Sequence, residues 1–230
     1  MNLTNHYNEL WNRSLQKFKK SEFEYDPFIN SINDNRYGIT LLARPTEKVK
    51  QNIANILDEL KAAEPNQYYY PGSDLHLTIL SIISCRAGFS LNEINPSEYQ
   101  EIVQSAVDSA SPFTINFQGF TASPSSILIQ GLPDHHQLSG LRNELREKFK
   151  TSGLMHSMDK RYHLKTAHMT AIRFKEPLKN AEAFIQKVSK CRQLDFGSSR
   201  ITKVELVKTN WYHQQDKVKT LAVFPLNNQL

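Results

Sequence analysis

The 230-residue sequence predicts an α+β domain built from two similar halves. Short runs rich in Ile, Leu and Val alternate with longer amphipathic stretches of helical period. The order strand, helix, strand occurs twice along the chain. In both copies the second strand carries a His-x-Thr triplet, His76-Leu77-Thr78 in the first half and His168-Met169-Thr170 in the second. The copies lie about 90 residues apart, which favours an internal duplication over a solenoid of short repeats.

The elements of the first half follow from their periodicity. Residues 3–18 repeat apolar side chains at helical spacing and predict an amphipathic helix. Residues 21–36 contain turn formers without a period and predict a connecting arm. Residues 37–43 predict a strand, 46–62 a helix with an apolar stripe, and 75–83 a buried strand rich in Ile and Leu.

The second half is predicted in the same way, with strands separated by turn residues and helices marked by a period of 3.6. In chain order the expected elements are a helix over 96–109, strands over 113–122 and 126–132, a helix over 137–150, a strand over 165–174, a helix over 179–190, and a closing hairpin over 201–210 and 218–226.

The composition excludes several classes of protein. Hydrophobic residues make up 39% and aromatic residues 10% of the chain, which is too much for a disordered protein. No apolar run approaches the roughly 18 residues of a membrane helix, and the N-terminus lacks the pattern of a secretory signal. Cys85 and Cys191 fit neither a disulfide framework nor a zinc site. We therefore expect a cytoplasmic protein that neither enters a membrane nor holds a metal.

The charge favours an anionic partner. The formal net charge is +5 and the isoelectric point is about 9.1. Such a balance is compatible with binding of nucleotides or RNA. No block of five or more Lys and Arg residues occurs, so a polybasic tail is not expected. A nucleotide or a short RNA is therefore a better candidate than a long RNA.

The two His-x-Thr triplets are the candidate chemical groups. Side chains at i and i+2 of a strand share a face, so His76 lies beside Thr78 and His168 beside Thr170. Two such pairs facing each other would surround a phosphate with two imidazoles and two hydroxyl donors. One histidine could take a proton from a nucleophile while the other gives one to the leaving oxygen, without a metal or cofactor. The alternative is a pair of structural histidines, each satisfied by a backbone carbonyl.

The segments that carry these triplets resemble a known family. LHLTIL (75–80) and AHMTAIRF (167–174), together with GITLLARP (38–45) and the closing VELVKTN and LAVFPL, are similar to the two-histidine (2H) phosphoesterase superfamily. This superfamily includes the RNA 2′,3′-cyclic phosphodiesterases, also called 2′–5′ RNA ligases. The resemblance covers about residues 36–226 and departs from the usual pattern at Ala171, where a bulkier aliphatic residue is common.

The resemblance implies a fold and a set of site residues. The fold is bilobal, with two antiparallel sheets lining a central cleft, helices outside and pseudo-twofold symmetry. The catalytic residues are His76, Thr78, His168 and Thr170, and no metal or cofactor is required. Arg173 matches a basic residue that can face the substrate phosphate. Residues 1–35 lie outside the resemblance and form an N-terminal helical extension to a phosphoesterase-like domain over 36–230.

Two aromatic residues are further candidates for binding substrate. Trp211 lies at the tip of the closing hairpin, where it could stack on a nucleobase or pack on the other lobe. Tyr37 opens the first strand and could face the cleft. The adjacent pair His135-His136 and the single His163 are expected to be surface residues.

Together these observations predict a metal-independent phosphodiesterase, or a reversible ligase, acting on 2′,3′-cyclic phosphate or 2′,5′-linked nucleotides or RNA. One alternative is a nucleotide-binding or RNA-binding module that keeps the cleft without catalysis. Another is a hydrolase of small non-nucleic cyclic phosphates. The sequence leaves open which histidine is the acid, and it leaves open the oligomeric state.

Overall fold

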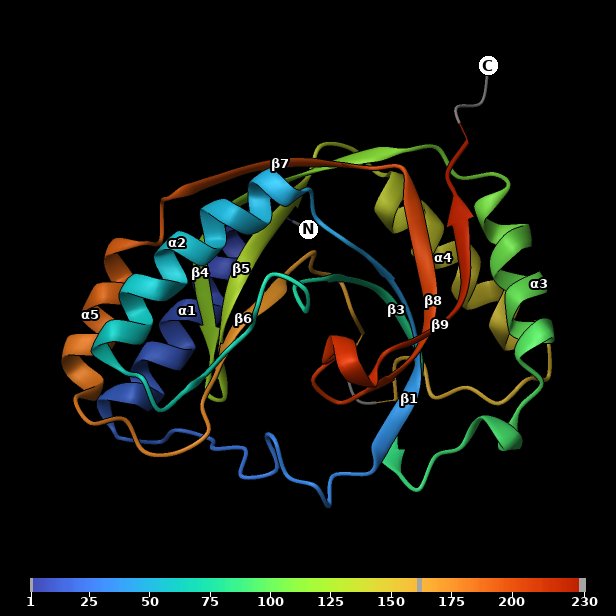
Figure 1. Cartoon of the computed structure of the whole chain (residues 1–230). Helices are drawn as coiled ribbons and strands as arrows, with labels where there is room; N and C mark the ends of the chain where they lie inside the picture. Colours follow the sequence, from blue (N-terminus) through green and yellow to red (C-terminus); the bar gives the residue numbers. More distant parts are fainter. Residues whose placement is uncertain (1, 161–162, 228–230) are drawn as a thin grey trace.

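A computed structural model describes residues 2–160 and 163–227 of the chain (Figure 1). These residues form five α-helices, two short 3₁₀ helices and nine strands. In chain order they are α1 (Leu3–Lys19), β1 (Arg36–Ala43), α2 (Glu47–Ala63), β2 (Tyr68–Tyr69), β3 (Leu77–Ala87), η1 (Leu91–Glu93), α3 (Pro96–Val107), β4 (Phe113–Ser123), β5 (Ser126–Pro133), α4 (Gln137–Thr151), β6 (Met169–Arg173), α5 (Ala181–Lys190), β7 (Asp195–Ile201), β8 (Lys203–Asn210), η2 (Gln215–Lys217) and β9 (Lys219–Pro225).

The strands form two antiparallel sheets. The four-stranded sheet has the order β3-β1-β8-β9, and the five-stranded sheet has the order β2-β6-β5-β4-β7. Every strand pair in both sheets is antiparallel. The α-helices lie on the outer sides of the two sheets, with α1, α2 and α5 in one lobe and α3 and α4 in the other (Figure 1). The predicted α+β fold with two antiparallel sheets and outer helices is confirmed.

In each half of the sequence, the helix between the two paired strands packs on the sheet of the other lobe. In the first half, β1 and β3 pair in the four-stranded sheet, but the intervening α2 packs on β7 of the five-stranded sheet. In the second half, β5 and β6 pair in the five-stranded sheet, but the intervening α4 packs on β3 of the four-stranded sheet. Each half thus contributes to both lobes, which makes the lobes interdependent.

The N-terminal helix α1 packs on the five-stranded sheet, against β4 and β5. Its apolar face buries Tyr7, Trp11 and Phe18, and the Ser14 hydroxyl donates a 2.8 Å hydrogen bond to the carbonyl of Ala122 in β4. The chain after α1 then runs without a helix or strand to β1, along the lower edge of the molecule in Figure 1. This arm spans from one lobe to the other.

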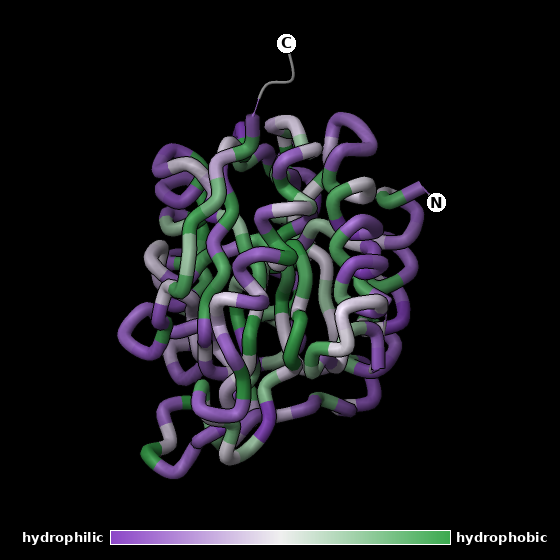
Figure 2. The backbone as a smooth tube through the Cα atoms, turned by 90° about the vertical axis from the view of Figure 1, so that its right-hand side faces the viewer, coloured by the Kyte–Doolittle hydropathy of each residue, from purple (hydrophilic) through white to green (hydrophobic). Residues whose placement is uncertain are grey.

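The hydrophobic residues concentrate on the strands, while the outer helices and loops are largely hydrophilic (Figure 2). Burying these apolar side chains between sheet and helix supplies the main stabilisation of each lobe. In the described part of the chain, no helix is both long enough and apolar enough to cross a membrane.

Two strands are absent from the sequence prediction. The edge strand β7 (Asp195–Ile201) alternates buried and exposed positions, but it carries Gly and Ser where an apolar signal would be needed. The two-residue β2 (Tyr68–Tyr69) is too short to show a period. The strand expected over 165–174 also begins only at Met169, so His168 immediately precedes the strand, as His76 precedes β3.

Candidate functional site

A cleft of about 390 Å³ lies between the two sheets. His76 and Thr78 line it from the four-stranded side, and His168 and Thr170 line it from the five-stranded side. The structure therefore brings both His-x-Thr pairs to one cavity. Further polar and aromatic side chains complete the lining, among them Tyr70, Ser81, Ser84, Ser123, Ser125, Ser126, Ser157, Asp159, Arg173, Trp211 and His213.

Strand alternation explains why these side chains reach the cleft. On the first motif, Leu77 and Ile79 are buried in the core of their lobe, so the flanking side chains point the opposite way. On the second motif, Ala167, Met169 and Ala171 are fully buried in the same manner. The apolar residues of each motif anchor the strand, and the polar residues between them are left to face the cavity.

The His76 imidazole is fixed by a backbone carbonyl. Its Nδ1 lies 2.7 Å from the carbonyl oxygen of Asp74, which can only accept a hydrogen bond. Nδ1 therefore carries the proton in the neutral ring, and Nε2 holds a lone pair. Burial lowers the pKa of His76 to about 4; the carbonyl opposes this shift, whereas the charges of Arg44 and His168 add to it.

The His168 imidazole has a different partner. Its Nδ1 lies 2.7 Å from the hydroxyl of Thr166, which can either donate or accept. Burial lowers the pKa of His168 to about 4, and the positive charges of Arg142 and Arg173 lower it further. The two histidines therefore differ: His76 faces a fixed acceptor, and His168 lies near two guanidinium groups.

Arg142 on α4 links the two motifs. Its Nε donates to the carbonyl of Ile79 at 2.8 Å, and one terminal nitrogen donates to the carbonyls of Thr78 at 2.8 Å and Thr166 at 3.0 Å. The side chain is only 3% exposed, so these bonds are shielded from water. Because Thr166 also contacts His168, this one guanidinium holds the backbone of the first motif against the segment that leads into the second.

Arg173 presents positive charge to the cleft. Its Nε is buried and has no hydrogen-bond partner in the part of the chain that the structure describes. Its guanidinium lies 5.8 Å from the ring centroid of Tyr212, and its backbone pairs with Ser126 across β5 and β6. Because Arg173 is one of the residues that line the cleft, its positive charge can attract an anion there.

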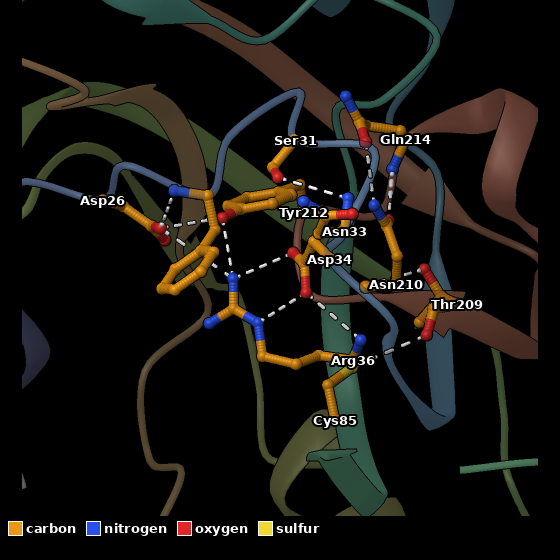
Figure 3. A network of polar contacts seen from close by, with 11 residues as sticks. Asp26, Ser31, Asn33, Asp34, Arg36, Cys85, Thr209, Asn210, Tyr212 and Gln214 are labelled. Atoms are coloured by element: carbon orange, nitrogen blue, oxygen red, sulfur yellow. Dashed lines mark hydrogen bonds and ion pairs between the residues drawn. The ribbon is translucent and has the colours of Figure 1, made fainter. Parts of the chain in front are cut away.

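The loop after β8 is held by the N-terminal arm (Figure 3). The Tyr212 hydroxyl donates to the Asp26 carboxylate at 2.8 Å and accepts from the Arg36 guanidinium at 2.8 Å. Tyr212 lies between Trp211 and His213, both of which line the cleft. The arm that the sequence placed outside the phosphoesterase-like domain thus supports one wall of the candidate site.

Of the two aromatic residues that the sequence suggested for substrate binding, only one lines the cleft. Trp211 lines the cleft, and the Arg36 guanidinium lies 5.1 Å from its ring centroid. Tyr37 is not among the residues that line the cleft; the Lys208 ammonium lies 4.1 Å from its ring centroid. Tyr37 therefore lies outside the lining of the candidate site.

Sequence reasoning missed His213. Its ring lies 4.0 Å from that of His76, centroid to centroid, with 27° between the ring planes. A single histidine in a predicted hairpin loop carries no signal that the loop folds back onto another histidine 137 positions earlier. Long-range contacts of this loop, among them those of the neighbouring Tyr212 with the arm, bring it there.

Three histidines considered in the sequence analysis lie outside the cleft. His135, His136 and His163 line a separate cavity of about 630 Å³ beside α4, and the His163 ring contacts Asp159 at 3.1 Å. Among the described residues, no group of three or more His, Cys, Asp or Glu side chains is arranged to hold a metal ion.

Two antiparallel sheets around a cleft lined by paired His and Thr residues define an α+β protein of the two-histidine phosphoesterase type. The chain belongs to the 2′-5′ RNA ligase superfamily, whose model matches residues 49–211. The resemblance inferred from the His-x-Thr segments is confirmed. The N-terminal extension and the loop beyond Trp211 lie outside the matched range.

Solved structures share this fold at low sequence identity. TT0787 of Thermus thermophilus is 15% identical with a TM-score of 0.58, and the match covers 84% of this chain and 99% of that one. Escherichia coli LigT in complex with 3′-AMP is 13% identical with a TM-score of 0.55 and the same coverage. ATU0111 of Agrobacterium tumefaciens is 12% identical with a TM-score of 0.54, covering 90% and 98%. No curated protein matches the chain.

Proposed function

We propose that the protein is a metal-independent phosphodiesterase that opens the 2′,3′-cyclic phosphate of a nucleotide or short RNA end. The observation that carries this proposal is the meeting of two His-x-Thr pairs and one guanidinium, that of Arg173, in a single cleft. Two imidazoles can divide acid and base work, and the hydroxyls and the cation can bind the phosphate oxygens.

The reaction is a displacement at phosphorus. A water molecule attacks opposite the departing ribose oxygen while His168 Nε2 takes its proton. The bond between phosphorus and that ribose oxygen breaks, and His76, which enters this step as the imidazolium, gives its Nε2 proton to the oxygen. Thr78 and Thr170 donate hydrogen bonds to the non-bridging oxygens, and Arg173 balances their charge. The product is a phosphomonoester with a free neighbouring hydroxyl, and the reverse condensation would be a ligation.

The surroundings of the two rings support this division of roles. At His76 the hydrogen bond to the Asp74 carbonyl favours the imidazolium and opposes the effects of burial and of the Arg44 and His168 charges, which suits a general acid. An imidazolium at His168 is disfavoured by the charges of Arg142 and Arg173, which suits a general base.

The lining of the cleft favours a nucleotide as the substrate. Its volume of about 390 Å³ falls within the range of about 300–1,000 Å³ that small-ligand sites occupy. Trp211 offers aromatic surface for a nucleobase. The LigT structures with 3′-AMP and with ATP give a precedent for nucleotide binding in this fold.

A substrate panel in the presence of EDTA tests the proposal. It contains 2′,3′-cyclic mononucleotides, RNA with a cyclic phosphate end, 2′,5′-oligoadenylate and a small non-nucleic cyclic phosphate. We expect turnover of the 2′,3′-cyclic phosphates that is lost in a variant carrying both His76→Ala and His168→Ala. Nucleotide binding without turnover would instead indicate a binding module. Turnover of the non-nucleic phosphate alone would indicate a different hydrolase, and activity that needs a divalent ion would contradict the metal-independent mechanism.

A further inference from the structure

A third imidazole lies against the proposed general acid. The rings of His213 and His76 are stacked, with centroids 4.0 Å apart, and both line the cleft. His213 comes from the loop between β8 and η2, which lies beyond the matched family range of 49–211.

The backbone at His213 adopts an unfavourable conformation to place the ring. Its φ of +56° falls in the left-handed region, which glycine adopts freely and a residue with a Cβ adopts at a cost. The loop is held there by hydrogen bonds from the His213 and Gln214 N–H groups to the carbonyl and side-chain oxygens of Asn210, at 3.2 and 3.0 Å. A strained position that is fixed this firmly indicates a use for the side chain.

The same residue orients His76 and anchors this loop. Asp74 accepts from His76 Nδ1 through its backbone carbonyl and from the Gln215 N–H through its carboxylate, at 2.7 and 3.1 Å. On the other side, the Gln214 side chain donates to Asn30 of the N-terminal arm at 2.9 Å. The stacking of the two rings is thus supported by hydrogen bonds on the His76 side and on the side of the loop, and it is not an incidental contact.

The unpartnered nitrogen of His213 keeps its ring neutral. Nδ1 is buried and has no hydrogen-bond partner within the described residues. A buried N–H without an acceptor is costly, so the single proton of the neutral ring resides on Nε2. An imidazolium would need acceptors at both nitrogens. Burial, and then the charges of His76, Arg44 and Arg173, accordingly lower the pKa of His213 well below its usual value.

We propose that His213 is a positioning residue, a neutral ring that covers one face of His76, keeps water from it and fixes the plane in which Nε2 meets the substrate. Because His213 does not compete for the proton, a proton that enters the pair resides on His76. The other groups that act on His76 are the Asp74 carbonyl and the charges of Arg44 and His168. The catalytic part of this inference rests on the proposed function, whereas the shielding of His76 does not.

Replacing His213 with glycine removes the ring and also relieves the strained φ, so the variant is expected to fold. The pKa of His76, measured by NMR of its ring nitrogens, should rise from about 4 toward 6.5, because the ring becomes exposed to water. His213→Phe restores an aromatic cover and should keep the pKa low. On the best substrate of the panel, His213→Gly should lower kcat about 10-fold or more with little change in KM, since the misplaced acid acts only in the transition state.

Ser21→Gly is the matched control. Ser21 has a φ of +59° and is exposed on the connection after α1, so the substitution relieves a similar strain away from the cleft. It should leave the His76 pKa and kcat unchanged. The inference is overturned if His213→Gly leaves the His76 pKa at its original value, or if His213→Phe raises that pKa as glycine does. Because the pKa is read without substrate, an inactive panel would contradict the proposed function and leave this test intact.

Discussion

The hydroxyl of Tyr7 in α1 accepts a 3.1 Å hydrogen bond from the backbone N–H of Ala167, the residue that precedes His168. The same hydroxyl donates to the carbonyl of Gly131 in β5 at 3.1 Å. Burial raises the pKa of Tyr7 to about 12, so the group remains protonated at neutral pH. The N-terminal helix therefore fixes the backbone from which the second motif begins.

Replacement of Tyr7 by Phe should lower both the stability of the protein and its kcat. The ring stays, but the Ala167 N–H and the Gly131 carbonyl lose a partner in a fully buried position. We expect a loss of about 1–3 kcal/mol in the free energy of unfolding, measured by urea denaturation, together with a lower kcat. Tyr25→Phe, at a side chain that is 37% exposed, is the control and should change neither. Equal stability of the two variants would show that the Tyr7 hydroxyl does not support the motif.

A substitution at Gly131 provides a second test of how the backbone before His168 is held in place. A Cβ at this position would collide with the carbonyl oxygen of Ala167, so β5 and the chain before His168 can approach only because residue 131 is glycine. Gly131→Ala should lower stability by about 1–3 kcal/mol, as overpacking does, and should lower kcat by displacing His168.

Gly140→Ala provides the control for this substitution. Gly140 lies on the exposed side of α4, and a Cβ there meets no atom within 4 Å. Alanine is the better helix former, so stability should rise by about 1 kcal/mol while kcat stays the same. A Gly131→Ala variant as active and stable as Gly140→Ala would contradict the close approach of β5 to Ala167.

The helices, most strands and both His-x-Thr motifs could be predicted from the sequence because each has a local signature. Leu77 and Ile79 alternate with His76 and Thr78 in a period of two, which places the polar pair on one face before any tertiary contact is known. The duplicated order of elements then indicates that the two motifs occupy equivalent places.

The residues that hold the site together carry no such signature. Arg142 resembles any arginine of an amphipathic helix, yet it is buried and binds the backbone of the first motif and of Thr166, which leads into the second. Tyr7 and His213 act through partners 160 and 137 positions away. These contacts follow from the packing of α1 on the five-stranded sheet, from the placement of α4 on the opposite lobe and from the arm that crosses between the lobes, which are long-range properties of the fold.

The protein should take up protons when it binds an anion in the cleft. The pKa values of His76 and His168 are about 4, so both rings are neutral at pH 7 in the free protein. A phosphate in the cleft favours the charged form of each ring and raises its pKa. The affinity for 3′-AMP should therefore increase as the pH falls from 7 to 5, with proton uptake visible in calorimetry in buffers of different ionisation enthalpy. Affinity independent of pH would mean that the anion does not lie beside these rings.

The same two histidines should make stability depend on pH. Their pKa is about 4 in the folded protein and 6.5 in an unperturbed histidine. As the pH falls from 6.5 to 4, these histidines become protonated in the unfolded chain while they stay neutral in the folded protein. The free energy of unfolding therefore decreases by on the order of 1–3 kcal/mol per histidine. Above pH 6.5 this contribution is constant. Denaturation curves of His76→Gln should show a weaker dependence in this window than the unmodified protein, and an unchanged slope would contradict the burial of a neutral ring.

The roles of the four motif residues can be separated by kinetics on the best substrate of the panel. His76→Ala and His168→Ala should each lower kcat by about 10²–10⁴, the usual worth of a positioned acid or base. The double variant should be little worse than the poorer single variant, because the two groups act as a unit in one displacement. Thr78→Val and Thr170→Val keep the shape and remove one donor, and each should cost less than the loss of a histidine.

The pH profile distinguishes the acid from the base. The rate of the unmodified protein should follow a bell, with one limb for each imidazole. In His168→Ala the limb that reports loss of the base should disappear, and in His76→Ala the limb that reports loss of the acid should disappear. His135→Ala, at an exposed histidine outside the cleft, should retain the full bell and the full rate. Full activity of either His76→Ala or His168→Ala would end the two-histidine mechanism.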